Sequence, residues 1–467
     1  MASAGSTHPG SEPRAVHLSR RQLLTGAAAS AALAAVAACA PGGNDNSGAN
    51  APSTVSTDLT KLGNVHLKML DFWPSGAEND WMNSVVKQFH AKYPNITITR
   101  TSQDWGDLNS TLNLRLADNG GPDIATANQG WQALGTYAKG HLVVDLSKYA
   151  DAYKWKGRVP ESLLRQQEFS SDGKQMGTGA LYAVPVASSS IIGINYNKKI
   201  LSSLGIQVPT TLAEFEAACA QIKAAGQVPI NFESLDAGPA TALLWDLQAM
   251  YGTKQNVAGF VYGDSSISVG NTGLLDAAQK VKQWADNGWF TPNYAGIAYQ
   301  DSVDSFKKGK GAFQFNYSGT LSPTGTEQND FGFTLLKQVN GGSTVGVGSS
   351  RAAVVISAKS AHPDAAAGFL DFLLSRQTAQ AAVDNNLTPA FYPDLTMPTN
   401  RPEFAEEVKA VQTMDADDGY VPYFDWTTNT LLDTVSRQLQ TMLAGKTTPQ
   451  NMLDAAQADR QKFASAG

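Results

Sequence analysis

The sequence predicts an α/β protein of two lobes, each a mainly parallel sheet flanked by helices. Segments with the residue pattern of strands alternate with segments of helical apolar spacing along most of the chain. This alternation is typical of βαβ units, which form parallel sheets with right-handed crossovers. The chain has 467 residues, 42% of them hydrophobic, and the roughly 400 residues that follow an atypical N-terminal segment are enough for two domains.

The N-terminal segment, residues 1–38, is predicted to be an export signal. Arg20 and Arg21 precede Leu23–Ala38, an alanine-rich stretch of sixteen residues. A membrane-spanning helix needs about 20 strongly apolar residues, so this stretch is too short to span a bilayer. A basic start, an apolar middle and a small-residue end are typical of a cleavable signal. The adjacent arginines resemble the twin-arginine type, and the general export route stays open as an alternative.

A lipid anchor and a tether are predicted to follow the signal. Val36–Cys39, "VAAC", resembles a bacterial lipobox, in which the chain is cut before a cysteine that then carries a lipid. Residues 39–60 are rich in Gly, Ser, Pro and Asn and poor in large apolar side chains, as in a flexible tether. We therefore expect an extracytoplasmic protein that lipidated Cys39 anchors to the outer face of the cell membrane.

The body of the chain opens with a strand, a helix and a second strand. Apolar side chains occupy both faces of residues 64–73, which predicts a strand buried on both sides. Residues 78–94 have helical apolar spacing with acidic residues at the start, and residues 95–100 alternate as a second strand. The pattern continues with a helix over 108–120, a short strand over 122–127 and a helix closed by Gly140.

The middle of the chain repeats this alternation. Residues 191–197 and 228–234 have strand patterns, and the segment between them contains a helix that Thr210 or Thr211 caps, with Glu214 at capping-box spacing. The glycine-rich segment 341–357 precedes a strand rather than a helix, so it lacks the order of a phosphate-binding loop. We expect this segment to approach a ligand closely or to cross between the lobes.

The charge of the chain argues against nucleic-acid binding. Loss of the signal, with Arg14, Arg20, Arg21 and Glu12, changes the formal charge from −6 to −8. An acidic chain without basic runs does not suit a polyanionic partner. The sequence also lacks the GxSxG and HExxH motifs of hydrolases, and its histidines are scattered in surface-like contexts, so no catalytic residues are predicted.

No disulfide, metal or cofactor is expected in the mature chain. With Cys39 lipidated, Cys219 has no partner, and its position in a helical pattern predicts a small core residue. Residues 415–426 resemble a calcium loop, but Gly419 stands at the fifth rather than the sixth place.

Six segments, in order along the chain, are similar to the motifs of one family. They are FHAKYPNITI, GGPDIATANQG, GHLVVDLSKY, ALYAVPVASSSIIGINYNKKILSSLGIQVPTTLAEF, FKKGKGAFQFNYSG and ISAKSAHPDAAAGFLDFLLS. Each motif is short, and their number and order give the match its strength. The chain resembles bacterial extracellular solute-binding proteins of the carbohydrate-uptake type, the family that includes the maltose-binding protein.

The resemblance implies a hinge-connected, two-lobed periplasmic-binding-protein fold in which each lobe is discontinuous in sequence. Lobe 1 would comprise residues 61–190 and about 350–395, and lobe 2 residues 191–349 and about 396–467, with crossings near 188–196, 347–358 and 393–422. It further implies a monomeric receptor that is not an enzyme. Such a receptor binds a carbohydrate in the cleft between its lobes and delivers it to the membrane permease subunits of an ABC importer.

A sugar needs flat aromatic faces for its ring and planar hydrogen-bonding groups for its hydroxyls, both placed where strands end at the cleft. Placement after predicted strands and loops selects Trp73, Ser75, Glu78, Asp104, Trp105, Asn128, Gln129, Asp236 and Trp245. The matching motifs imply Asn316, Tyr317 and Trp426 as further ligand-binding residues, and Arg351 is expected to contact hydroxyls or a structural carboxylate. Tyr317 and Ser318 stand where relatives often carry a glycine and a tryptophan. The tryptophans assigned to packing are Trp81, Trp131, Trp155, Trp284 and Trp289.

The candidate loops are poor in Lys and Arg, which favours an uncharged ligand, a neutral mono- or oligosaccharide. A ligand-facing Trp426 would be replaceable by alanine with little loss of stability. Two alternatives stay open. One is a receptor for another polar solute, such as a polyol, glycerol phosphate or polyamine. The other is a secreted enzyme that acts on polysaccharide, because carboxylate pairs are abundant in the chain.

Overall fold

Two β-sheets organise the described part of the chain, which in this computed structural model comprises residues 54–321, 330–392, 394–397 and 402–466. The predicted export signal, Cys39 and residues 40–53 of the predicted tether lie outside the described residues. The first sheet contains, in spatial order, β2 (Ile96–Ser102), β1 (Val65–Asp71), β3 (Ile124–Ala127), β11 (Ala353–Ile356) and β6 (Val184–Pro185). The second contains β12 (Tyr420–Val421), β10 (Gly346–Ser350), β7 (Ser189–Asn197) and β8 (Phe313–Tyr317), with β9 (Phe331–Thr334) also paired to β7. The short strands β4 (Glu168–Phe169) and β5 (Ala180–Leu181) pair with each other.

The first sheet begins with the predicted βαβ unit. β1 runs parallel to β2 and to β3, with Met69 opposite both Arg100 and Ile124. β11 runs antiparallel to β3, with Ala353 opposite Ala127. The carboxyl ends of β1, β2 and β3 and the beginning of β11 therefore lie along one edge of the sheet.

The second sheet differs from the expectation of a mainly parallel sheet. β7 runs antiparallel to β8, β9 and β10, whereas β10 and β12 are parallel. The difference arises at the strands that connect the two sheets, because β7 directly follows β6 of the first sheet and β10 directly precedes β11. The end of β8, the end of β10 and the start of β7 consequently share one edge.

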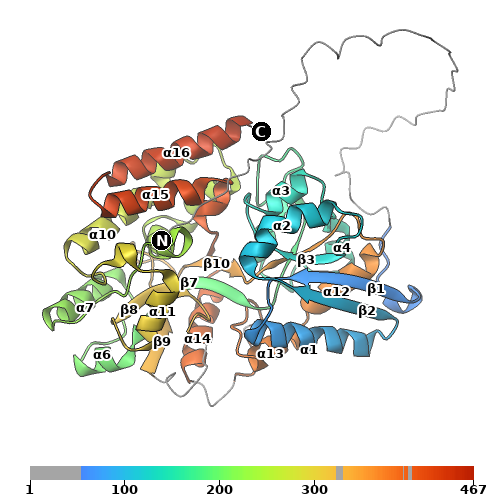
Figure 1. Ribbon diagram of the computed structural model, residues 1–467, viewed down its shortest axis with the longest axis horizontal. Helices are drawn as coiled ribbons and strands as arrows, with labels where there is room; N and C mark the ends of the chain where they lie inside the picture. The colour runs from blue at the N-terminus through green and yellow to red at the C-terminus, as the bar shows by residue number, and fades with distance from the viewer. Residues whose placement is uncertain (1–53, 322–329, 393, 398–401, 467) are drawn as a thin grey trace, which may run out of the picture. The chain divides into compact units, whose positions relative to one another are not determined.

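Helices flank both sheets (Figure 1). α1 packs against β2, α12 against β11, and α8 against β7, β8 and β10. The longer helices are α1 (Gly76–Lys92), α2 (Trp105–Ala117), α7 (Leu212–Ala224), α8 (Ala237–Tyr251), α9 (Lys254–Tyr262), α10 (Leu274–Asp286), α11 (Tyr299–Lys307), α12 (Pro363–Leu373), α13 (Arg376–Asp384), α14 (Pro402–Ala416), α15 (Leu431–Leu443) and α16 (Pro449–Ala466). The shorter ones are α3 (Leu134–Lys139), α4 (Ser147–Tyr153), α5 (Glu161–Arg165), α6 (Lys198–Ser203) and the 3-10 helices η1 (Leu59–Lys61), η2 (Val269–Asn271), η3 (Tyr294–Gly296) and η5 (Phe424–Thr427).

The chain passes between the two sheets several times. Residues 186–188 connect β6 to β7, and Arg351 and Ala352 connect β10 to β11. α13 contacts α1 beside the first sheet, and α14, the next helix in the sequence, contacts β9 of the second sheet. The two sheets are therefore each assembled from separate stretches of sequence.

Several local predictions are confirmed by α7. Thr211 is the N-cap, and its side chain accepts a hydrogen bond from the backbone N–H of Glu214, whose side chain completes the capping box. Cys219 lies on the buried side of the same helix with no exposed surface. Burial of this small apolar side chain is the role that the helical pattern predicted.

Two local expectations are wrong. His66 and Lys68 of β1 are exposed, so this strand is buried on both faces only in its second half. Leu59, expected in the flexible tether, exposes 2% of its surface. Its side chain packs closely on Gly368 of α12. A Cβ atom added at that glycine would lie 2.3 Å from Cδ1 of Leu59. The folded body therefore starts before residue 60.

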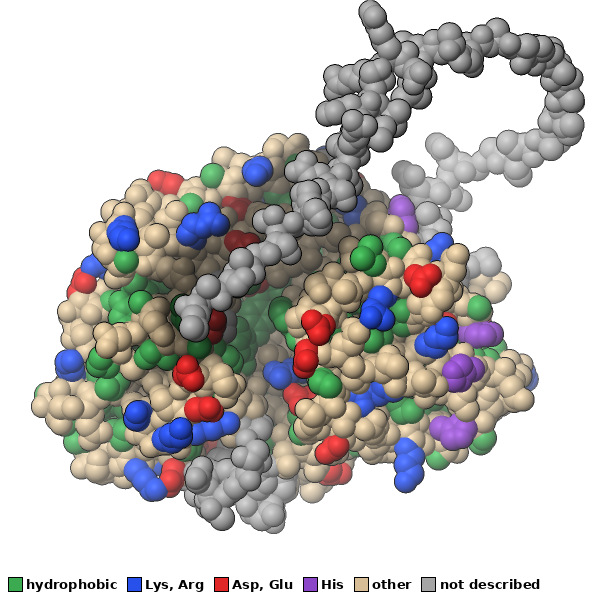
Figure 2. Space-filling model, in the orientation of Figure 1, with side chains coloured by type: hydrophobic (Ala, Val, Ile, Leu, Met, Phe, Trp, Pro, Cys, Tyr) green, Lys and Arg blue, Asp and Glu red, His purple; other side chains and the backbone are tan. Residues whose placement is uncertain are grey.

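The surface carries charges of both signs, interspersed on the face that Figure 2 shows. His66, His90, His141 and His362 are all exposed, as their sequence contexts predicted. Within the described ranges, no helix combines the length and the apolar character needed to cross a bilayer.

Candidate ligand-binding site

The residues predicted from the first sheet follow three neighbouring parallel strands. After β1 come Trp73, Ser75 and Glu78, after β2 come Asp104 and Trp105, and after β3 come Asn128 and Gln129. Because parallel strands end at the same edge of a sheet, these residues are gathered along one edge, beside the beginning of β11. Strand ends at such an edge are the usual binding position in open α/β sheets.

These residues differ in how much surface they expose. Trp105 exposes 54%, and Ser75 and Asp104 are exposed as well. Trp73 exposes only 4%, and its ring lies edge-on to that of Trp81, with 5.9 Å between the ring centroids. Its Nε1 has no hydrogen-bond partner among the described residues. Buried N–H groups normally have one. The ring of Trp73 belongs to the buried apolar cluster that also contains Trp81, so this tryptophan differs from the exposed Trp105 in its surroundings.

The segment between β10 and β11 brings Arg351 to this edge. The Nη2 atom of Arg351 lies 3.1 Å from Oε1 of Glu78 in the first turn of α1. Nearby, Nε2 of Gln129 donates to Oγ of Ser350, at 3.4 Å. Of the two roles considered for Arg351, pairing with a carboxylate is the one observed, and the carboxylate belongs to another predicted site residue.

The residues predicted from the second sheet are joined by Tyr299 at the start of α11. Its hydroxyl donates to Oδ1 of Asn316 at 2.8 Å, and its backbone N–H donates to Oδ2 of Asp236 at 2.7 Å. Asn316 exposes 1% of its surface, and its Nδ2 has no partner among the described residues. Tyr299 thus links the end of β8 to the loop before α8, and the side-chain Nδ2 of Asn316 remains available as a donor.

Three aromatic side chains form a row beside these groups. The ring of Tyr317 lies 6.3 Å from that of Tyr423, which lies 5.1 Å from that of Trp426. The backbone carbonyl of Trp426 accepts a hydrogen bond from the backbone N–H of Trp131, in the segment after β3. A Cβ at Gly130 would lie 2.5 Å from Trp426, so only glycine fits this contact. The row, Tyr317–Tyr423–Trp426, therefore extends from the end of β8 to the loop after β3.

Two buried carboxylates adjoin this aromatic row. Burial raises the pKa of Asp425 to about 6. The Oδ2 atom of Asp425 accepts a hydrogen bond from Nε2 of Gln132 at 2.9 Å, and this bond acts in the opposite direction by stabilising the ionised carboxylate. Burial also raises the pKa of Glu233, in the loop before α8, to about 7. The pKa of the Tyr317 hydroxyl is raised mainly by burial and further by nearby charges, including those of Asp425 and Glu233. The charges of both carboxylates therefore act on Tyr317, and burial raises the pKa of each above its ordinary value.

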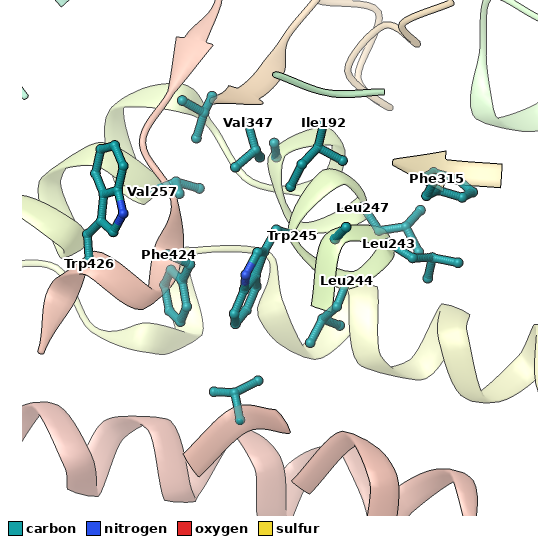
Figure 3. Packing of buried hydrophobic residues seen from close by; sticks show 14 of the residues in the cluster. Ile192, Leu243, Leu244, Trp245, Leu247, Val257, Phe315, Val347, Phe424 and Trp426 are labelled. Atoms are coloured by element: carbon teal, nitrogen blue, oxygen red, sulfur yellow. The ribbon is translucent and has the colours of Figure 1, made fainter. Parts of the chain in front are cut away.

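Trp245 is a correction to the predicted site. It lies in the middle of α8 rather than near its start, exposes 2% of its surface, and its ring centroid lies 5.3 Å from that of Phe424. Figure 3 shows Trp245 and Phe424 among apolar side chains, with Trp426 on the other side of Phe424. Because α8 packs against three strands of the second sheet, an indole at this place on the helix becomes part of the core.

The tryptophans were expected to supply the flat aromatic faces of the site, but most of them are buried. Trp105 is exposed, whereas each of the other eight exposes 8% or less. The five assigned to packing from the sequence, Trp81, Trp131, Trp155, Trp284 and Trp289, are confirmed as buried. Tyrosine supplies two of the three rings in the aromatic row.

Sequence reasoning missed five residues of this region, namely Gln132, Glu233, Tyr299, Tyr423 and Asp425. Tyr423 and Asp425 flank Trp426 within the sequence YFDW, and Glu233 opens the loop that contains Asp236. Tyr423, Asp425 and Glu233 could have been identified from the sequence because each lies within a few positions of a predicted site residue. Gln132 and Tyr299 lie at the beginnings of helical segments and carried no such signal.

In the described part of the chain, no group of three or more His, Cys, Asp or Glu side chains lies close enough together to hold a metal ion.

Comparison with known proteins identifies the family. The family model for bacterial extracellular solute-binding proteins matches residues 73–380. A multiple sugar-binding protein of Streptococcus mutans is 23% identical over 325 residues, which cover 66% of this chain and 71% of the relative. An uncharacterized ABC transporter extracellular-binding protein of Pyrococcus horikoshii is 22% identical over 330 residues, which cover 68% of this chain and 70% of the relative. The solved structure of a chitin oligosaccharide binding protein has the same fold, with a TM-score of 0.68 at 19% identity over 86% of this chain and 99% of that chain. The chain belongs to the bacterial extracellular solute-binding protein family.

Proposed function

We propose that this protein captures a neutral mono- or oligosaccharide and delivers it, chemically unaltered, to the membrane permease of an ABC importer. The family membership supports a receptor for a solute. The names of the relatives support the ligand class and the transporter, since one is a sugar-binding protein and another an ABC transporter binding protein.

The observation that carries the proposal is the aromatic row between strand ends of the two sheets. A pyranose ring presents apolar C–H faces that suit the rings of Tyr317, Tyr423 and Trp426. Its hydroxyl groups suit the carboxylates of Asp425 and Glu233 as acceptors. The unpartnered Nδ2 of Asn316 suits a hydroxyl oxygen as a donor. Two or three such contacts with accompanying hydrogen bonds are sufficient for micromolar binding, roughly −8 kcal/mol.

The charges at the site favour a ligand without net negative charge. Among the candidate site residues, Arg351 is the cation, and it is paired with the carboxylate of Glu78. An anionic solute would meet Glu233, Asp236 and Asp425 instead. This balance argues against a glycerol phosphate and is compatible with a neutral sugar.

We further propose that the ligand lies in a cleft between two lobes that close by a hinge motion. The lobes are those of the resemblance, residues 61–190 with about 350–395, and residues 191–349 with about 396–467. Arg351 and Ala352 form one of the connections that such a hinge would use. Lipidated Cys39 would keep the receptor, a monomer, on the outer face of the membrane beside its permease.

Titration calorimetry of the mature protein against a panel of sugars, with product analysis of the same samples, tests this proposal. The expected result is saturable binding of one uncharged saccharide with no new reducing ends. Catalytic release of reducing ends would establish the polysaccharide-acting enzyme instead. Tight binding of a polyol, a glycerol phosphate or a polyamine, with no sugar bound, would assign the receptor to another solute class.

A further inference from the structure

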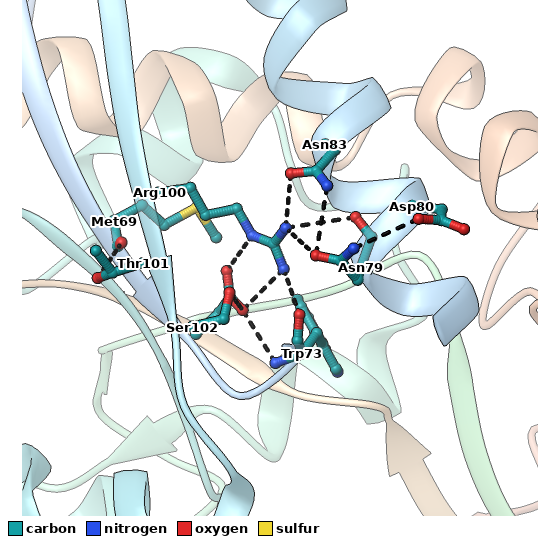
Figure 4. A network of polar contacts seen from close by, with 9 residues as sticks. Met69, Trp73, Asn79, Asp80, Asn83, Arg100, Thr101 and Ser102 are labelled. Atoms are coloured by element: carbon teal, nitrogen blue, oxygen red, sulfur yellow. Dashed lines mark hydrogen bonds and ion pairs between the residues drawn. The ribbon is translucent and has the colours of Figure 1, made fainter. Parts of the chain in front are cut away.

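Arg100 forms a dense polar network at the edge of the first sheet where the candidate site lies (Figure 4). It belongs to β2, and its side chain is only 9% exposed. Its Nε donates to Oδ2 of Asp71 at 2.5 Å, and its Nη2 donates to Oδ1 of Asp71 at 2.9 Å and to the backbone carbonyl of Trp73 at 2.7 Å. Its Nη1 donates to Oδ1 of Asn79 at 2.7 Å and to Oδ1 of Asn83 at 2.8 Å. Each of its three nitrogens is therefore engaged.

The carboxylate of Asp71 completes the network from the end of β1. Asp71 has no exposed surface, and its Oδ1 also accepts hydrogen bonds from the backbone N–H of Trp73 at 3.0 Å and from Oγ of Ser102 at 2.8 Å. A buried ion pair costs desolvation energy, which is offset only when good geometry and further hydrogen bonds satisfy both charges. A planar guanidinium meets that requirement by bidentate contact, which a lysine ammonium cannot reproduce.

The network holds a segment that the candidate site depends on. Both backbone polar groups of Trp73 are engaged, its N–H by Asp71 and its carbonyl by Arg100. Asn79 lies in the first turn of α1, and its side chain accepts a hydrogen bond from the same guanidinium group. Segment 73–79, which these hydrogen bonds hold at both ends, contains Trp73, Ser75 and Glu78. Glu78 also forms an ion pair with Arg351.

We propose that Arg100 is a positioning residue for ligand binding, which fixes segment 73–79 so that Ser75 and Glu78 face the ligand in a preformed arrangement. Arg100 itself does not contact the ligand. This inference rests on the proposed function, because it assigns Arg100 to the site that would hold the saccharide. Preorganised loops bind more tightly because less conformational entropy is lost on binding.

The chain offers a matched control in Arg158. Its Nη1 donates to Oδ1 of Asp371 at 2.7 Å, and its Nη2 donates to the carbonyls of Asp371 and Leu374 at 3.3 and 3.2 Å. This arginine likewise pairs with one aspartate and donates to backbone carbonyls, but it makes a single bond to the carboxylate. It packs beside α12 rather than at the strand ends that carry the site. Arg100→Lys and Arg158→Lys therefore each remove guanidinium hydrogen bonds to an aspartate and to backbone carbonyls, at two different places.

The experiment measures, in the mature protein, the Kd for the tightest sugar of the panel, the Tm, and amide hydrogen exchange in segment 73–79. For Arg100→Lys we expect Kd to rise at least tenfold and exchange in segment 73–79 to accelerate more than in the rest of α1. For Arg158→Lys we expect a lowered Tm with Kd within twofold of the unmodified protein. Asn79→Ala, which leaves the buried Arg100–Asp71 pair in place, should give a smaller change of the same kind.

A folded Arg100→Lys protein with unchanged Kd, or with segment 73–79 exchanging no faster than in the control, would overturn the proposal. If Arg100→Lys does not fold, the same criteria apply to Asn79→Ala. If the unmodified protein binds no sugar, the proposed function fails. The exchange measurement then decides by itself whether Arg100 fixes this segment.

Discussion

The guanidinium of Arg351 lies 3.1 Å from the carboxylate of Glu78, and this contact joins the segment between β10 and β11 to the first turn of α1. The two residues were selected from the sequence separately, Glu78 as a ligand contact and Arg351 as a contact to hydroxyls or to a structural carboxylate. The pair is partly exposed, with 37% and 22% of the two side chains accessible. Partly exposed ion pairs contribute up to about 1 kcal/mol to stability, so the contact matters more for the arrangement of the site than for the fold.

We predict that Glu78→Gln and Arg351→Gln each weaken saccharide binding while lowering Tm only slightly. The double variant should lose less affinity than the two single losses combined, because both changes break the same contact. Calorimetry on the four proteins of this cycle measures the coupling. Lys282→Gln, which breaks the ion pair with Asp286 on α10, serves as the control with unchanged affinity. Strict additivity of the two site variants would argue against a functional role for the pair.

Trp426→Ala is expected to weaken binding more than tenfold and, contrary to the sequence-based expectation, to lower stability as well. The side chain exposes only 3% of its surface and packs against Gly130. Truncation of a buried aromatic side chain typically costs about 3–5 kcal/mol. Denaturant unfolding and calorimetry separate the two effects. Trp426→Phe, which keeps a ring, should recover part of the affinity, and an unchanged Kd in the folded alanine variant would remove Trp426 from the site.

We predict that affinity declines as the pH is lowered through about 6. Burial raises the pKa of Asp425 to about 6, and a ligand hydroxyl donates best to the ionised carboxylate. The contribution of Asp425 to affinity is therefore complete above this pH and is lost as Asp425 takes up a proton. Glu233, whose pKa burial raises to about 7, adds a decline that begins at higher pH. In Asp425→Asn the decline below about pH 6 should disappear, and persistence of the whole profile in that variant would contradict this assignment.

Replacement of Asp246 should stabilise the protein at neutral pH. Burial within α8 raises the pKa of this carboxyl well above its usual value, and its Oδ2 has no hydrogen-bond partner among the described residues. The folded state then holds its proton more tightly than the unfolded state, so the group's contribution to stability falls as pH rises above about 3.9. Asp246→Asn should raise Tm at pH 8 and differ little from the unmodified protein near pH 4. Asp151→Asn, at an exposed position of α4, should change neither value, and a lower Tm for Asp246→Asn at pH 8 would contradict the prediction.

The thiol of Cys219 should be unreactive in the native protein. It has no exposed surface, and burial raises its pKa far above that of a free thiol. Because the thiolate is the reactive form, a thiol reagent should modify Cys219 only after denaturant is added. The assay uses protein in which Cys39 is replaced. Rapid stoichiometric labelling without denaturant would indicate that α7 opens in the native state.

Much of the fold could be predicted because local patterns specify it. The strand of β1, the helix α1 and the strand of β2 follow from apolar periodicity, and the start of α7 follows from Thr211 and Glu214. The antiparallel pairing of β7 was missed because the direction of a strand depends on its distant partners β8 and β10. The position of Leu59 was missed because composition describes a segment and not the hydrophobic contact that a single side chain makes.

The candidate site was predicted in part for the same reason. Trp73, Trp105 and Asn128 were selected because each follows a strand, and strand ends are visible in the sequence. Whether an indole faces a ligand or the core depends on the helices that cover it, which is why Trp245 was misassigned. Tyr299 was missed because its hydrogen bonds to Asp236 and Asn316 unite segments that are far apart in the chain.

Native mass spectrometry of the mature protein with the panel sugars, followed by release and weighing of the ligand, tests the central claim most directly. The account predicts one saccharide per chain, recovered with its mass unchanged, and loss of the complex in a folded Tyr423→Ala protein. A folded protein that retains no sugar of the panel, or one that returns a cleaved sugar, would contradict it.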